Sequence, residues 1–254
     1  MSAALAIYVT MLGTAVGSFL NVCIHRLPLG LSLAWPASHC PSCRAPVKPY
    51  DNVPIVSYLW LRGRCRNCRA PISIKYPIVE LVTGAMFLGA FLLFDSPELI
   101  QRLLFGCAMV VLFVVDLEHR ILPDVITLPG IVIGFLFSFF MPPGWVDSLI
   151  GIVVGGGSLW LVGEIYFRVR HEEGMGFGDV KMLAMIGAFL GWKLMLLTLI
   201  LSSFIGSIVG VTMIALHRGD MKYALPFGTF LALGAIAAST AGRLIIDWYA
   251  SFYA

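Results

Sequence analysis

Two aspartates occur at the ends of strongly apolar segments, where a carboxylate is costly. Asp116 follows the apolar run at residues 105–115, and Asp179 ends the glycine-rich stretch at residues 174–179, just before another apolar segment. Charged side chains at membrane depth are rare because they are expensive, and they are usually functional. If the two carboxylates meet across a helix bundle they can share one proton, which is the arrangement used in aspartic proteolysis. The pair therefore predicts acid–base chemistry on a peptide bond.

The local sequence predicts different surroundings for the two acids. The alternating glycines of Gly174-Met-Gly-Phe-Gly-Asp179 allow a sharp turn and place Asp179 at or just before a helix N-terminus, where the helix dipole favours the charged form. Asp116 is expected to end its helix, where the dipole acts in the opposite direction. These opposite helix-dipole effects suit a pair in which one aspartate holds a proton and the other acts as the base. An alternative class of protein, a transporter that uses these acids as a proton or ion relay, stays open.

Other charged residues near apolar segments have more ordinary interpretations. Asp124 follows Pro123 and is expected to cap the helix predicted at residues 125–141 rather than to act in catalysis. Lys181 is expected to be an interface residue that extends toward water. Glu80 and Glu164 lie in or at the ends of apolar segments, and the sequence assigns neither a role.

The composition indicates that the chain folds in a membrane rather than in water. Apolar residues make up 59% of the 254 residues and charged residues only 12%, against about 25% charged in soluble proteins. A soluble chain of this length cannot cover so much apolar surface, so we predict an all-α polytopic membrane protein. The net charge of +3 is too small to favour a nucleic-acid partner.

Hydropathy predicts about eight transmembrane helices. The expected segments are residues 3–24, 78–94, 99–115, 125–141, 149–167, 180–191, 194–216 and 226–248, of which 180–191 is the shortest. The first is expected to be a retained helix rather than a signal peptide, because no basic region precedes it. Glycines 155–157 are expected to mark close helix packing.

Basic residues predict the orientation. Eight of the 17 lysines and arginines fall between residues 24 and 78, whereas the loops around residues 95–98 and 142–147 carry acids and no base. Because cytoplasmic loops are enriched in basic residues, we place the segment after the first helix in the cytoplasm. Asp116 and Asp179 then lie at the cytoplasmic side.

The cytoplasmic segment at residues 25–77 contains two cysteine pairs. They are Cys40-Pro-Ser-Cys43 and Cys65-Arg-Asn-Cys68, with 21 residues between the pairs. This spacing is close to that of a tetrahedral structural zinc site. Two disulfides are the alternative, which a reducing cytoplasm disfavours. So short a segment builds only a small core, and a bound metal is the expected source of stability.

Together these motifs resemble the type IV prepilin peptidases, also called leader peptidase/methyltransferases, of the GxGD aspartyl protease class. The resemblance covers nearly the whole chain. It rests on the two cysteine pairs and on residues 17–28, 75–80, 116–124 and 174–184. It implies three parts: a first transmembrane helix at 1–24, a zinc-binding domain at 25–77 and a peptidase bundle at 78–254.

The resemblance also implies an activity. Type IV prepilins and type II secretion pseudopilins would be cleaved just after a glycine, at the cytoplasmic side of the bacterial inner membrane, with Asp116 and Asp179 as the catalytic pair. The new N-terminal residue would then be methylated from S-adenosylmethionine. Cys40, Cys43, Cys65 and Cys68 would hold a structural zinc. No S-adenosylmethionine motif is visible, so the donor site is assigned to no residue, and the expected partners are the pilin substrates and the lipid bilayer.

Overall fold

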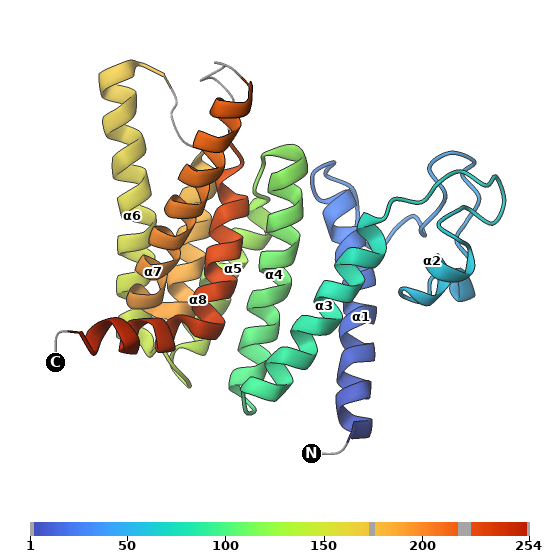
Figure 1. Ribbon diagram of the computed structural model, residues 1–254, viewed down its shortest axis with the longest axis horizontal. Helices are drawn as coiled ribbons and strands as arrows, with labels where there is room; N and C mark the ends of the chain where they lie inside the picture. Colours follow the sequence, from blue (N-terminus) through green and yellow to red (C-terminus); the bar gives the residue numbers. More distant parts are fainter. Residues whose placement is uncertain (1–2, 173–175, 218–224, 253–254) are drawn as a thin grey trace. The chain divides into compact units, whose positions relative to one another are not determined.

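The computed structural model describes residues 3–172, 176–217 and 225–252 (Figure 1). The described residues form eight α-helices, α1 to α8, and one short 3-10 helix, η1. Six of these helices are long and apolar enough to cross a membrane. The predicted all-α polytopic membrane fold is therefore confirmed.

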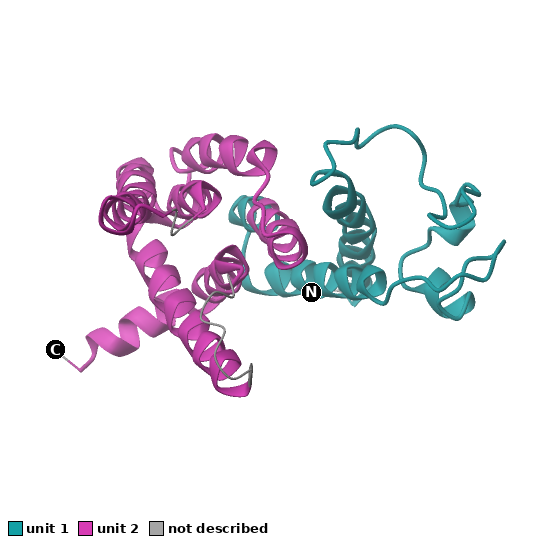
Figure 2. Ribbon diagram, turned by 90° about the horizontal axis from the view of Figure 1, so that it is seen from above, with its two compact units in different colours: residues 1–103 teal, residues 104–254 magenta. Residues whose placement is uncertain are grey.

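The chain divides into two compact units, Met1–Leu103 and Leu104–Ala254 (Figure 2). The boundary falls within α4, which runs over Glu98–His119. The three-part division at residues 24 and 77 stays a prediction, because compactness alone does not say which residues act together.

In the first unit, α1 (Ala3–Arg26) packs along α3 (Lys75–Leu93). The two backbones approach closely because α1 carries glycines on the contact face. A Cβ on Gly17 would lie 2.8 Å from the Cα of Glu80. Between these helices, the chain forms η1 (Pro49–Asp51) and the five-residue helix α2 (Val56–Trp60).

The second unit is a bundle whose central element is α7 (Phe177–His217). The helix packs against α5 (Asp124–Phe137), α6 (Trp145–Arg170) and α8 (Phe227–Ala250). Met182, Leu183 and Ile186 on α7 are fully buried in its core. This core also contains Phe105 and Leu112 of α4 and Leu231 of α8.

Helix α7 contains two of the expected segments, and α5 is shorter than expected. The segments expected at residues 180–191 and 194–216 correspond to the two parts of α7 on either side of Gly191, where the backbone is not helical and φ is +76°. Only glycine adopts this conformation readily. The helix expected at 125–141 ends at Phe137 after 14 residues, and residues 138–140 form turns.

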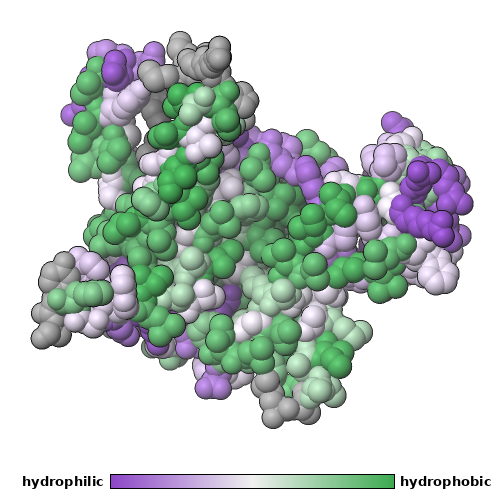
Figure 3. Space-filling view, in the orientation of Figure 1, coloured by the Kyte–Doolittle hydropathy of each residue, from purple (hydrophilic) through white to green (hydrophobic). Residues whose placement is uncertain are grey.

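Large apolar side chains cover the outer faces of the long helices (Figure 3). Ile200, Phe204 and Val211 of α7, for example, are more than half exposed. In water such a surface would be a strong aggregation hazard, whereas in a bilayer it faces lipid. Hydrophilic residues gather instead on the segment between α1 and α3 (Figure 3).

Glycines control how closely α6 and α7 pack. The backbones of Gly151 and Gly187 touch, so that a Cβ on either residue would collide with the other. Gly155 lies against Leu183 and Gly156 against Ala184, whereas a Cβ on Gly157 would meet nothing within 4 Å. The prediction of close packing at 155–157 is thus confirmed for the first two glycines and wrong for Gly157.

We expect Gly187→Ala to destabilise the bundle, because the added methyl group meets the Gly151 backbone, which has no side chain to move aside. Overpacking of this kind costs about 1–3 kcal/mol. Gly157→Ala is the matched control: it adds the same methyl group in open space and gains roughly 0.5–1 kcal/mol of helix stability. Thermal unfolding in detergent measures both, and equal midpoints for the two variants would contradict this packing.

Candidate functional site

Asp116 lies in the last turn of α4 and is 5% exposed. Its Oδ2 accepts two hydrogen bonds from Thr229, one from the backbone N–H at 2.6 Å and one from the hydroxyl at 3.0 Å. Gly228 permits this contact, since a Cβ there would stand only 3.0 Å from the same oxygen. The Asp116 carboxylate is therefore held by the start of α8.

The position of Thr229 adds a second helix end to the surroundings of Asp116. Thr229 is the third residue of α8, and the first amides of a helix have no partner within the helix and carry partial positive charge. Asp116 lies in the last turn of its own helix, as expected, and the N-terminus of α8 also faces it. The sequence analysis did not identify Thr229. The only feature of the sequence that points to it is the helix start at Pro226-Phe-Gly-Thr229.

Asp179 is the third residue of α7, as the sequence predicts for an acid at a helix N-terminus. Its N–H donates to the carbonyl of Gly176 at 3.1 Å. Gly178 lets this turn approach the α4–α5 loop, since a Cβ there would lie 3.0 Å from that of Leu122. Gly174, the first glycine of the predicted motif, lies outside the described residues.

Both aspartates line one open pocket of about 270 Å³ in the second unit. The pocket is bordered by the end of α4, the α4–α5 loop and the start of α7. Its lining residues are Asp116, Arg120, Ile121, Leu122, Asp124, Gly176, Gly178 and Asp179. The two predicted aspartates, far apart in the sequence, thus border the same pocket.

Asp124 also lines this pocket, but it is not the cap of α5. The N-cap position is Pro123, and Asp124 is the first helical residue, so the N-cap prediction was wrong. Its two carboxylate oxygens accept hydrogen bonds from Lys181 Nζ at 2.7 and 2.8 Å. Lys181 lies two residues after Asp179, so this ion pair ties the start of α5 to the first turn of α7.

Glu80 and Glu164, to which the sequence assigned no role, have partners outside the aspartate pocket. Glu80 is 8% exposed, and its Oε2 accepts a hydrogen bond from the backbone N–H of Ile55 at 2.7 Å. Glu164 forms an ion pair with Arg168, one turn further along α6, at 2.8 Å. Neither residue lines the aspartate pocket.

The four predicted metal ligands converge in the first unit. The sulfur atoms of Cys40, Cys43, Cys65 and Cys68 all lie within 4.8 Å of one another, and no disulfide joins them. Cys40 Sγ and Cys68 Sγ are 3.8 Å apart. Zinc–sulfur bonds of about 2.3 Å in a tetrahedron require sulfur separations of roughly 3.8 Å. The donor set therefore fits a zinc ion.

Sequence reasoning overlooked that the two cysteine pairs belong to a repeat. Residues 40–46 and 65–71 both read Cys-x-x-Cys-Arg-Ala-Pro. In each copy the first cysteine N–H donates to the alanine carbonyl, at 2.9 and 2.8 Å, and the arginine has a positive φ, 57° for Arg44 and 63° for Arg69. Two similar backbone turns thus present their sulfur atoms to one point.

The thiols do not ionise alike. The backbone N–H of Ala45 and the side chain of Asn67 lower the pKa of Cys43 to about 6. The N–H of Ala70 alone would lower the pKa of Cys68, but burial and the neighbouring thiols raise it to about 11. The first thiolates form readily, and accumulating negative charge opposes the last. A divalent cation supplies the charge that allows all four to ionise.

Comparison with known proteins identifies the family. Residues 11–94 match the bacterial peptidase A24 N-terminal domain, and residues 103–211 match the type IV leader peptidase family. The chain is similar to the prepilin leader peptidase/N-methyltransferases of Pseudomonas putida (36% identity, 96% of this chain and 91% of the relative) and Pseudomonas aeruginosa (37%, 95% and 92%). That of Myxococcus xanthus is 40% identical over 82% of this chain and 63% of the relative.

The chain belongs to the prepilin leader peptidase/N-methyltransferase family, whose peptidases are the A24 aspartic enzymes. The family resemblance inferred from the motifs is confirmed, and the transporter alternative receives no support. No solved structure matches the chain. The leader peptidase match at residues 103–211 contains Asp116 and Asp179, and the A24 N-terminal match contains all four cysteines.

We expect the purified leader peptidase homologue to hold about one zinc per chain, measured by elemental analysis. Cys43→Ser and Cys68→Ser should each lower the zinc content, because a hydroxyl is a poor substitute for a thiolate ligand. Cys107→Ala is the control, since it removes a cysteine of α4 outside the cluster. Full zinc content in both serine variants would show that the metal, if present, is held elsewhere.

Proposed function

We propose that this chain removes the leader peptide of type IV prepilins and type II secretion pseudopilins, just after a glycine. The observation that carries the proposal is that Asp116 and Asp179 line one pocket within the part of the chain that matches the leader peptidases. Basic residues concentrated in the segment after α1 support a cytoplasmic site in a bacterial inner membrane.

The surroundings of the two carboxylates suggest a division of labour. Asp116 accepts an N–H and an O–H hydrogen bond on one oxygen, and such bonds stabilise an ionised carboxylate. We therefore assign Asp116 as the base and Asp179 as the proton donor. Two like charges at one site do not ionise together easily, which keeps one proton on the pair.

Hydrolysis then follows from these two roles. Asp116 accepts a proton from a water molecule, whose oxygen attacks the scissile carbonyl carbon, while Asp179 donates its proton to the carbonyl oxygen. Collapse of the tetrahedral intermediate breaks the carbon–nitrogen bond. The leaving amine takes up the proton held by Asp116, and one hydroxyl of the intermediate returns its proton to Asp179 as the new carboxyl group forms. The apolar stem of the substrate remains in the bilayer beside the helices.

The second activity that we propose is N-methylation of the new N-terminus. The donor, S-adenosylmethionine, carries a methyl group on a sulfonium. The amine nitrogen forms a bond to this methyl carbon as the carbon–sulfur bond breaks, and the amine then loses a proton. Residues 25–77 and the neighbouring helix ends are the proposed location, with the cysteine cluster as a structural metal site and residues 78–254 as the peptidase bundle.

We expect Asp116→Asn and Asp179→Asn each to slow leader removal at least about 100-fold, because each acid has a different proton-transfer role. Asp124→Asn should be milder, since it weakens only the ion pair with Lys181. Asp247→Asn, an exposed position near the end of α8, controls for the substitution itself. The assay follows loss of leader mass from a pilin precursor incubated with purified protein.

Retention of most activity by either Asp116→Asn or Asp179→Asn, with normal thermal unfolding, would remove that residue from the catalytic pair. Inactive Asp124→Asn combined with active Asp116→Asn would transfer the first catalytic role to Asp124. Absence of cleavage by the wild-type protein for every pilin precursor tested would contradict the peptidase proposal as a whole.

We expect Asp179→Asn to methylate a pre-cleaved pilin at a rate close to that of wild type. A carboxylate pair for peptide hydrolysis has no part in bringing a sulfonium donor to an amine. Mass spectrometry should show one methyl replacing one hydrogen, only when S-adenosylmethionine is present. If wild-type protein cleaves precursors but leaves this substrate unmethylated, the chain is a peptidase alone.

A further inference from the structure

The short helix α2 exposes the side that a soluble protein would bury. Val56, Leu59 and Trp60 are 59%, 68% and 79% exposed, and their spacing places them on one face of a helix. Ser57, about a quarter of a turn from Val56, is only 8% exposed. Val56 and Trp60 border an open pocket with Tyr50 and Arg66, yet the three apolar side chains remain largely exposed, whereas Ser57 packs inward.

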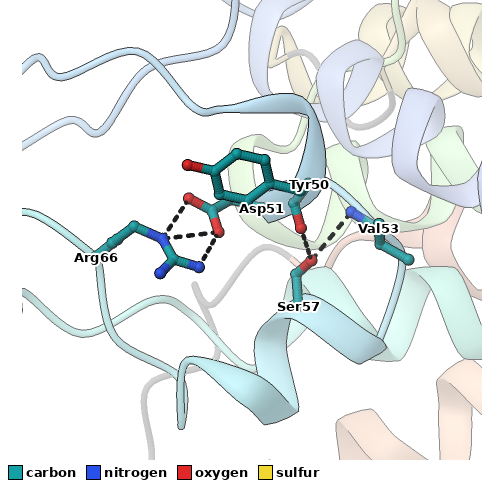
Figure 4. A network of polar contacts seen from close by, with 5 residues as sticks. All are labelled: Tyr50, Asp51, Val53, Ser57 and Arg66. Atoms are coloured by element: carbon teal, nitrogen blue, oxygen red, sulfur yellow. Dashed lines mark hydrogen bonds and ion pairs between the residues drawn. The ribbon is translucent and has the colours of Figure 1, made fainter.

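Polar contacts hold α2 in this orientation (Figure 4). The Ser57 hydroxyl donates to the carbonyl of Tyr50 in η1 at 2.9 Å and accepts from the N–H of Val53 at 3.1 Å. Just before α2, the N–H of Ile55 donates to Oε2 of Glu80 at 2.7 Å. These bonds hold Ser57 inward and leave the large apolar side chains of α2 exposed.

The bond to Glu80 also sets the depth of α2. Helix α3 has 19 residues, or about 28 Å at 1.5 Å per residue, and it needs nearly this whole length to cross a hydrocarbon core of about 30 Å. Glu80 lies five residues into α3, about 7.5 Å from its start. Figure 1 accordingly shows α2 apart from α1 and α3 but at the height of their upper turns rather than beyond their ends.

Two exposed arginines follow the apolar face directly. Arg62, with φ of +53°, ends the helical turn, and Arg64 comes two residues later. Lys75 begins α3 nearby in sequence. Tryptophan is enriched where bilayer meets water, and basic side chains at this level attract anionic lipid headgroups.

We propose that α2 is an interfacial membrane anchor. Val56, Leu59 and Trp60 enter the boundary between headgroups and acyl chains, and Arg62 and Arg64 contact the phosphates of anionic lipids. Asp51 of η1 accepts hydrogen bonds from Arg66 at 2.6–3.0 Å, so the anchor is also connected to the second cysteine turn. Lipid binding by α2 thereby orients the metal cluster relative to the bilayer, whether or not the proposed activities hold.

Tryptophan fluorescence of the full-length protein in nanodiscs tests the anchor. The emission of Trp60 is obtained by subtracting the emission spectrum of Trp60→Phe from that of the wild type. We expect lipids brominated near the headgroup end of their chains to quench it at least about twofold, as they would a side chain at this depth. The matched control adds Ser42→Trp to Trp60→Phe, and this exposed position in the first cysteine turn should not be quenched.

Unchanged zinc content of Trp60→Phe verifies that the domain is intact. Trp60 emission that brominated lipids leave unchanged would overturn the proposal. If that emission is also shielded from a water-soluble quencher, a second copy of the chain or another protein covers the face instead.

The arginines are tested by lipid charge. We expect quenching of Trp60 to be stronger in nanodiscs with phosphatidylglycerol than with phosphatidylcholine alone, and this difference should disappear in Arg62→Ser/Arg64→Ser. A difference that persists in the double variant would refute the role of these arginines.

Discussion

The central constraint in the second unit is the stabilisation of one carboxylate in apolar surroundings. Asp116 is nearly buried among helices that face lipid, and the two hydrogen bonds from Thr229 compensate for the lost contact with water. These bonds fix the end of α4 against the start of α8. The start of α7 borders the same pocket and brings Asp179 to it.

The helix packing serves this arrangement. The core of the unit is formed around α7, whose residues 182–190 are almost entirely buried. Gly151 and Gly187 bring the backbones of α6 and α7 into contact, which any residue with a Cβ at these positions would prevent. The ion pair between Asp124 and Lys181 adds a polar contact between α5 and α7 at the pocket. A packed scaffold of this type keeps the acidic groups of the pocket at fixed positions, as the proposed acid–base catalysis requires.

The first unit meets the opposite difficulty, a polar segment too short for a large core. The cysteine cluster, the hydrogen bonds of η1 and α2, and the ion pair between Asp51 and Arg66 replace the missing apolar interior. Two copies of one seven-residue turn contribute equally to the cluster, so a single metal ion would order both ends of the segment. The bond from Ile55 to Glu80 then connects this segment to α3.

Local patterns in the sequence determined the membrane class, most of the helices, the metal ligands and the two acids. Long apolar runs permit little except spanning helices, and Cys-x-x-Cys pairs have few uses other than metal binding or disulfides. The partner of Asp116 was decided by tertiary structure, because Thr229 is 113 residues away and its local sequence marks a helix start but not the contact. The pairing of Asp124 with Lys181 and the outward apolar face of α2 have the same origin. Each depends on which helix ends meet, and the packing of the whole bundle decides that.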